Sequence, residues 1–169
     1  KAQRWLPWRQ LIPHTRRYIR RPVTDYPRGL LSQGVADIIA AGGYGSIGSH
    51  GQQHGIGSHW DVWLYAEAME PIAALEVASL HGAIFLGLEQ DLGSLRAGKL
   101  ADLVVLNGNP LEDIRKTADL AYVMKAGVLY DANSLDEIWP RTRPFGNTPW
   151  YIPEMYRADN RPLDIWDRR

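Results

Sequence analysis

LEVASLHGAIFLGLEQDLGSLRAGKLADLVVLNGNPLEDI, residues 75–114, changes its apolar period half-way along. As far as Gly87 the apolar side chains recur at helical spacing, and a glycine at that point is typical of a helix end. After Leu88, a glycine-punctuated turn at residues 96–99 leads into the apolar run Leu103 to Leu106, which predicts a buried strand. A helix, a turn and a strand in this order are typical of an α/β protein.

The chain before this segment predicts a second α/β unit. LLSQGVADIIAAGG, residues 30–43, has helical spacing and closes on Gly42 and Gly43, a helix stop. YGSIGS, residues 44–49, is predicted to be a strand, and a glycine-rich loop follows its carboxyl end, where sites of α/β proteins gather. A further helix is predicted from Pro71 to Gly87, and we expect it to be well buried because it is apolar almost all round.

The chain after residue 106 carries weaker patterns. PLEDIRKTADL, residues 110–120, predicts a short polar helix or turn, and LAYVMKAGVLYD, residues 120–131, predicts a hairpin that turns near Ala126 and Gly127. From Pro140 onward, prolines and aromatic residues alternate without a period, which indicates an extended tail laid over a surface.

Composition limits the classes of function. A chain of 169 residues with 45% hydrophobic content suits one domain, and the absence of cysteine excludes disulfides, thiolate zinc sites and a cysteine nucleophile. Nineteen cations against nineteen anions give no overall attraction to nucleic acid or anionic membrane. Residues 1–28 hold eight cations and only Asp25 as an anion, interleaved with aromatics. Since the remainder is net negative, pairing within the protein is favoured over nucleic-acid binding.

Three of the five histidines lie in GGYGSIGSHGQQHGIGSHWD, residues 42–61. His50, His54, His59 and Asp61 have side chains that suit zinc, manganese or iron, and no Lys or Arg occurs between residues 29 and 95. The glycines argue against a helix here, and the alternative is a set of polar loop residues bonded to backbone. A dinucleotide fingerprint is disfavoured, because these glycines precede or form the strand instead of opening a helix. His81 is expected to be a packed or capping residue, not a ligand.

The segment 75–114 closely resembles the C-terminal signature of the amidohydrolase superfamily, and the hairpin after it resembles the ending of that signature. The resemblance covers about residues 30–140, and GSHGQ with the following HW looks like the imidazolonepropionase and prolidase-like branch. The matching positions are Ala78 to Ala83, Leu86 to Leu88, Gly93 to Leu95, Gly98 and Lys99, and Ala101 to Leu106.

This resemblance implies the C-terminal part of a (β/α)8 barrel joined to part of a small composite β-sandwich. Residues 1–29 would form a basic, irregular segment and residues 30–90 the last barrel strand with its closing helices. Residues 91–140 would belong to the sandwich, and residues 141–169 to the tail. We therefore expect the chain to be a C-terminal piece of a larger enzyme.

The resemblance also implies one or two divalent ions, zinc foremost, and hydrolysis of a C–N bond in an amide, cyclic amide or dipeptide-like substrate by metal-activated water. His50 stands where the family places an aspartate, and is the predicted catalytic residue and metal ligand. Gln52, His54 and His59 are predicted to bind the substrate.

The expected partners are the remainder of the barrel, which would supply most of the metal ligands, and a small-molecule substrate. Neither nucleic acid nor membrane is expected, and association of identical chains is left open. The alternative function is a non-catalytic interaction module that docks through its basic and aromatic N-terminal segment.

Overall fold

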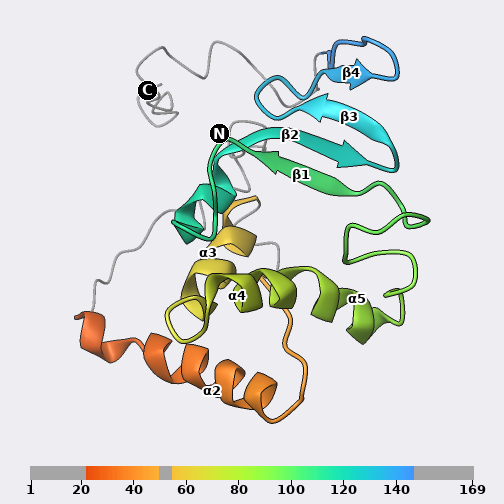
Figure 1. The fold of residues 1–169 in the computed structure, drawn as a ribbon. Helices are drawn as coiled ribbons and strands as arrows, with labels where there is room; N and C mark the ends of the chain where they lie inside the picture. Colours follow the sequence, from red (N-terminus) through yellow and green to blue (C-terminus); the bar gives the residue numbers. More distant parts are fainter. Residues whose placement is uncertain (1–21, 50–54, 147–169) are drawn as a thin grey trace, which may run out of the picture.

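The computed structural model describes residues 22–49 and 55–146, and within them a group of helices lies beside an antiparallel sheet (Figure 1). None of the described helices is long and apolar enough to cross a bilayer. The elements are η2 Val23–Asp25, α2 Arg28–Ala40, α3 Ile56–Tyr65, α4 Pro71–Ala78, α5 Leu80–Leu86, β1 Leu103–Leu106, η3 Ile114–Ala118, β2 Leu120–Lys125, β3 Val128–Asp131 and β4 Glu137–Trp139.

Helix α2 confirms the first predicted helix and its glycine stop. The amide of Gly43 donates to the carbonyl of Ile38 at 2.9 Å, which closes the end of the helix. The hydroxyl of Ser32, a buried residue, donates back to the carbonyls of Arg28 and Gly29, both at 3.2 Å. A hydroxyl satisfied within its own helix can be buried at little cost.

The second predicted helix is interrupted, because α4 and α5 are separated by Ser79 at φ −128° and ψ −79°. The hydroxyl of Ser79 donates to the carbonyl of Leu75 at 2.7 Å, and Gly87 ends α5 in the left-handed conformation, as predicted. The expectation that this helix is well buried was wrong for α5: Phe85 is 81% and Leu86 67% exposed. An apolar side chain is buried only where another element covers it, and none of the described elements covers this side of α5.

The sheet is an antiparallel meander in the order β1-β2-β3-β4. The predicted hairpin is confirmed: Lys125 pairs with Val128, and the two intervening residues, Ala126 and Gly127, have φ of 50° and 80°, as in a type I′ turn. The predicted strand Leu103–Leu106 is also confirmed as β1. Its predicted burial was wrong for Val104 and Val105, which are 55% and 40% exposed.

The predicted strand at residues 44–49 was wrong for this structure, because the segment belongs to no sheet. A strand is defined by hydrogen bonds to a neighbouring strand, and all strands of the described part come after residue 102. The parallel sheet of a barrel is likewise not found among residues 22–49 and 55–146. The described part of the expected α/β fold is therefore a helical layer followed by an antiparallel sheet.

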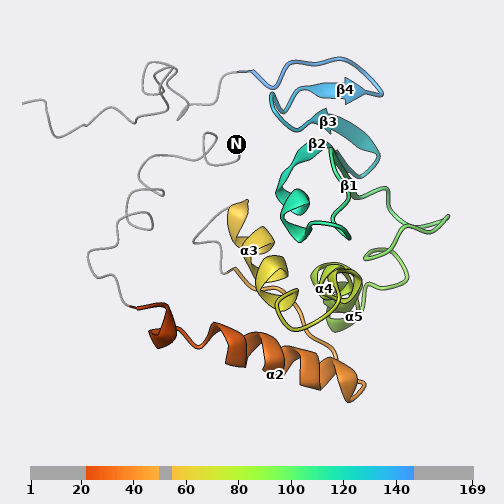
Figure 2. The same cartoon turned by 60° about the vertical axis from the view of Figure 1, so that its left-hand side comes forward.

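Helix α3 connects the helical layer to the sheet side of the molecule (Figure 2). The indole N–H of Trp63 donates to the hydroxyl of Thr117 in η3 at 2.9 Å, and that hydroxyl donates to the carbonyl of Ile114 at 2.9 Å. The guanidinium of Arg115 lies 5.1 Å from the centre of the Trp63 ring, within range of a cation–π contact. Thr117 is buried, so this junction is a fixed point between α3 and the chain that leads into β2.

A buried carboxylate closes the far end of the sheet. Glu137 at the start of β4 is 2% exposed, and its two oxygens lie 2.7 Å from Nε of Arg141 and 3.0 Å from Nε of Arg143. The backbones of Glu137 and Arg143 also exchange two hydrogen bonds of 2.9 Å. These pairings hold residues 141–143 against β4.

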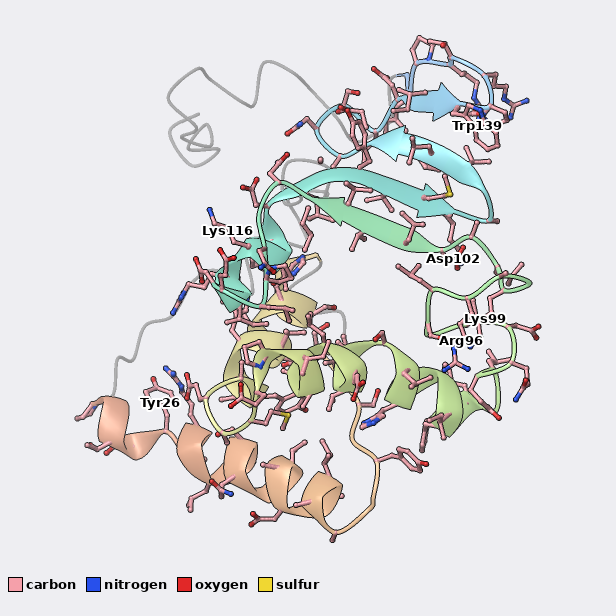
Figure 3. All side chains as sticks on the ribbon, in the orientation of Figure 1. Tyr26, Arg96, Lys99, Asp102, Lys116 and Trp139 are labelled. Carbon is pink, nitrogen blue, oxygen red and sulfur yellow. The ribbon has the colours of Figure 1, made fainter. Side chains whose placement is uncertain are left out.

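Asp102, labelled in Figure 3 beside the start of β1, is expected to make stability depend on pH. The amide of Ala126 donates to its carboxylate at 2.6 Å and Lys125 forms an ion pair with it, and these contacts lower the pKa of Asp102. Because the pKa of Asp102 is lower in the folded protein than in the unfolded chain, its carboxylate stabilises the fold fully at pH values above the unfolded-state pKa of about 4. This stabilisation is lost as the pH falls through the folded-state pKa. Urea unfolding between pH 2 and pH 6 should show this loss in the wild type and a flatter profile in Asp102→Asn.

Candidate functional site

The segment 44–49, which leads to His50, lies against the helical layer. A side chain at Gly45 would meet Val35 Cγ1 at 3.0 Å and Val77 Cγ1 at 3.5 Å, so this position allows α2 and α4 to approach the backbone. The ring of Tyr44 meets the ring of the buried His81 edge to face, with 5.1 Å between centroids. The expectation that His81 is a packed residue is therefore confirmed.

Helix α3 holds the same segment through two side chains. The amide of Gly48 donates to Oδ2 of Asp61 at 3.0 Å, and the hydroxyl of Tyr65 donates to the carbonyl of Ser46 at 3.1 Å. Burial raises the pKa of Tyr65, and the nearby negative charge of Asp61 raises it further. The phenol therefore stays protonated at neutral pH and keeps its role as a donor.

His59 lies in a helix, which corrects the prediction that glycines would keep residues 50–61 in a loop. Gly55 takes the position before α3 with φ 76°, and Gly57 is buried inside the helix, where a small residue permits close packing. Apolar residues farther along α3, with Val62 buried, stabilise the helix despite its glycine. Burial lowers the pKa of His59, so its imidazole is neutral at pH 7 and one ring nitrogen can accept a proton, a hydrogen bond or a metal.

The structure tests only part of the predicted site. His50, Gln52 and His54 lie outside the described residues, and their predicted roles remain predictions. His59 and Asp61 are described, and the carboxylate of Asp61 is engaged by the Gly48 amide. Across residues 22–49 and 55–146 no group of three or more His, Asp or Glu side chains could hold a metal ion.

An open depression of about 340 Å³ is lined by Ser46 of the segment 44–49 and by residues of α4, α5 and the loop that follows α5. Its walls are small or apolar, and its polar side chains are two serines, so it offers no acid, base or ligand set for chemistry. The lining residues are Ser46, Ala78, Ser79, Gly82, Ala83, Phe85, Leu86, Leu92 and Gly93.

The sequence did not reveal that Asp61 and Tyr65 bind the backbone of residues 46–48. Their spacing was the available signal, since residues four apart lie on one face of a helix. That signal requires α3 to be recognised first, and the glycines at 55 and 57 concealed it. The carboxylate of Asp61 was instead considered as a metal ligand.

Lys99, in the loop between α5 and β1, makes structural contacts. Its ammonium group donates to the carbonyls of Glu89 and Leu92, the latter at 3.0 Å, and Figure 3 shows it in that loop. The amide of Leu100 also donates to the carbonyl of Asp91 at 3.0 Å. The two bonds of the ammonium group tie Lys99 to the backbone of this loop.

Comparison with known proteins identifies the family. A family model described as Amidohydrolase family matches residues 14–130. The chain belongs to the amidohydrolase family. This confirms the resemblance seen in residues 75–114, and the match extends over the helices, β1, β2 and most of β3.

Individual relatives of this amidohydrolase match it over shorter stretches. The adenine deaminase 3 of Rhizobium meliloti (strain 1021) is 42% identical over 50 residues, which are 28% of this chain and 8% of that protein. The 5'-deoxyadenosine deaminase of Methanobrevibacter smithii is 34% identical over 73 residues, 41% of this chain and 15% of that protein.

A solved structure of a Xaa-Pro dipeptidase with bound methionine is 38% identical, with a TM-score of 0.44 over 47% of this chain and 20% of that chain. The amidohydrolase chain thus spans less than a sixth of the length of the two deaminases and about a fifth of the dipeptidase.

Proposed function

We propose that these 169 residues are the C-terminal part of a metal-dependent amidohydrolase that hydrolyses a C–N bond in an amide, cyclic amide or dipeptide-like substrate. The observation that carries the proposal is the family match over residues 14–130, which includes the anchored segment that leads to His50. The two matched relatives are named as deaminases, and a deaminase also breaks a C–N bond. The segment 44–49 would become the eighth barrel strand when neighbouring strands pair with it.

The donor chemistry of the chain fits a divalent metal, with zinc proposed. Burial lowers the pKa of His59, which favours its neutral form, and no Lys or Arg lies between residues 29 and 95 to repel a cation. His50 would hold one or two ions together with ligands outside this chain. When bound, the metal would polarise the scissile carbonyl and lower the pKa of its water.

The remaining steps belong to side chains of this chain. As the alternative to metal ligation, the free ring nitrogen of His50 would take the proton of the attacking water and return it to the leaving nitrogen, since an imidazole exchanges protons near neutral pH. Gln52, His54 and His59 would orient the substrate through hydrogen bonds. None of these roles requires residues beyond the loop and the first turn of α3.

The exposed apolar side chains support the proposed partner, the remainder of the barrel. On α2, Leu30 is 79% exposed, and on α5, Phe85 is 81% exposed. Large apolar side chains are buried when another element covers them, so exposure on both helices is consistent with a missing partner. We propose that further barrel elements of the same enzyme cover these helices and that the exposed face of β1 receives the rest of the β-sandwich.

Metal removal tests the proposed function. The enzyme that contains residues 1–169 should contain a divalent metal by elemental analysis and hydrolyse members of a panel of dipeptides, cyclic amides and aminopurines. Dialysis against a chelator should abolish turnover, and zinc should restore it. Full activity after verified metal removal, or no turnover and no metal in the folded enzyme, would contradict the proposal.

A further inference from the structure

We infer that Asp61 is a positioning residue that fixes the chain on the amino side of His50 by accepting the Gly48 amide. The inference deepens the proposed function and rests on it for its catalytic part. The contact joins residues that are thirteen positions apart in the chain, with 3.0 Å between the amide nitrogen of Gly48 and Oδ2 of Asp61. Asp61 thereby acts through the backbone and not on the substrate.

The two bonds made by α3 are geometrically matched. The carbonyl of one residue and the amide two residues later point to the same side of an extended segment, and here those groups belong to Ser46 and Gly48. Asp61 and Tyr65 lie one helical turn apart on α3 and supply the acceptor and the donor that the two groups need. The helix thus binds a carbonyl and an amide of the segment through two side chains.

The helix that carries this pair is itself fixed. Val62 is 5% exposed, and the next residue, Trp63, is tied to the buried Thr117 by a bond of 2.9 Å. An anchor of this kind transmits a defined position, because the helix that carries it is held by these two contacts. Outer-shell bonds that orient a ligand typically matter about 10- to 100-fold for metal affinity or activity.

Paired variants at one position separate the hydrogen bond from the charge. Asp61→Ala removes the acceptor, while Asp61→Asn keeps an oxygen for the Gly48 amide and removes the charge. In the enzyme that contains residues 1–169, Asp61→Ala should lower kcat about 10- to 100-fold with KM changed less than about 3-fold. Asp61→Asn should stay within about 5-fold of wild type, since it retains a neutral hydrogen bond.

Hydrogen exchange gives a readout that does not depend on turnover. The Gly48 amide should exchange about 2- to 10-fold faster in Asp61→Ala, because it loses one ordinary hydrogen bond. In Asp61→Asn it should exchange near the wild-type rate, because the side-chain oxygen of asparagine still accepts that bond. Tyr65→Phe leaves the Gly48 bond in place and should have the smaller effect on kcat. Asp37→Ala and Tyr122→Phe, which remove a helix carboxylate and a phenol elsewhere, are the matched controls and should change neither measurement.

Three results would overturn the inference. Equal losses of kcat in Asp61→Ala and Asp61→Asn would show that charge, not the hydrogen bond, matters. Loss of metal in Asp61→Asn would show that the carboxylate is a ligand. Unchanged exchange of Gly48 in Asp61→Ala would show that the bond does not hold the segment. An inactive, metal-free wild type would contradict the proposed function alone, because the exchange measurement would still report on the anchor.

Discussion

His50→Ala is expected to lower kcat by about 10²- to 10⁴-fold, the range for loss of a positioned proton-transfer group. Metal content after dialysis separates the two proposed roles: a lower content in this variant identifies His50 as a ligand, and an unchanged content identifies it as the proton shuttle, because one acceptor nitrogen cannot serve both. The segment that leads to His50 is held by α3 through Asp61 and Tyr65, so the loss should not come from unfolding of that segment. Steady-state kinetics and elemental analysis of the purified enzyme provide the measurement.

Two comparison variants sharpen this result. His50→Asp places the family's usual residue at the position and should recover kcat to within about 10-fold of wild type, since a carboxylate can also bind metal and exchange protons. His54→Ala should raise KM with little change in kcat, as expected for loss of substrate binding that is equal in ground and transition states. Wild-type kcat and metal content in His50→Ala would remove this residue from the mechanism.

Gly93→Ala is expected to destabilise the protein by about 2 to 5 kcal/mol. Gly93 has φ 83°, which costs an alanine about 1 to 2 kcal/mol, and overpacking typically costs a further 1 to 3 kcal/mol, roughly. The added Cβ would lie 2.6 Å from Cβ of Ala83 and 3.0 Å from Cα of Leu80, neither of which can turn away. Urea unfolding followed by tryptophan fluorescence should show the loss as a lower midpoint at an unchanged slope.

Gly98→Ala is the matched control. Gly98 has φ 92°, but a Cβ there meets nothing within 4 Å, so only the backbone cost of about 1 to 2 kcal/mol applies. The difference between the two variants therefore isolates the close approach of the loop to α5. Equal destabilisation would show that the loop is not held against α5 at Gly93.

Local signals account for most of the fold that was predicted correctly. Gly87 ends α5 and the Ala126 and Gly127 pair turns the hairpin, because each of these features depends on a few neighbouring residues. The errors concern partners that lie far away in the chain. Within the part of the chain that the structure describes, residues 44–49 have no paired strand and no element covers Phe85, and neither property can be read from the local period of a segment.

The site was predictable to a smaller extent. The motif in residues 75–114 led to the amidohydrolase family, which the family match confirms, but it gave no position for any side chain. His59 was placed in a loop because of Gly55 and Gly57, whereas tertiary packing of Val62 and Trp63 stabilises α3 there. The contact of Asp61 with Gly48 follows from that helix, so it could not be predicted while the helix was missed.

The meander of the sheet has a kinetic consequence. Each strand pairs with the next strand along the chain, so its contacts span few residues, and structures built from such local contacts fold quickly. The bond between Trp63 and Thr117 instead closes a separation of 54 residues. Folding of this region would thus begin with the local pairings within the sheet, and the long-range contact between α3 and η3 would form later, because its loop closure costs more entropy.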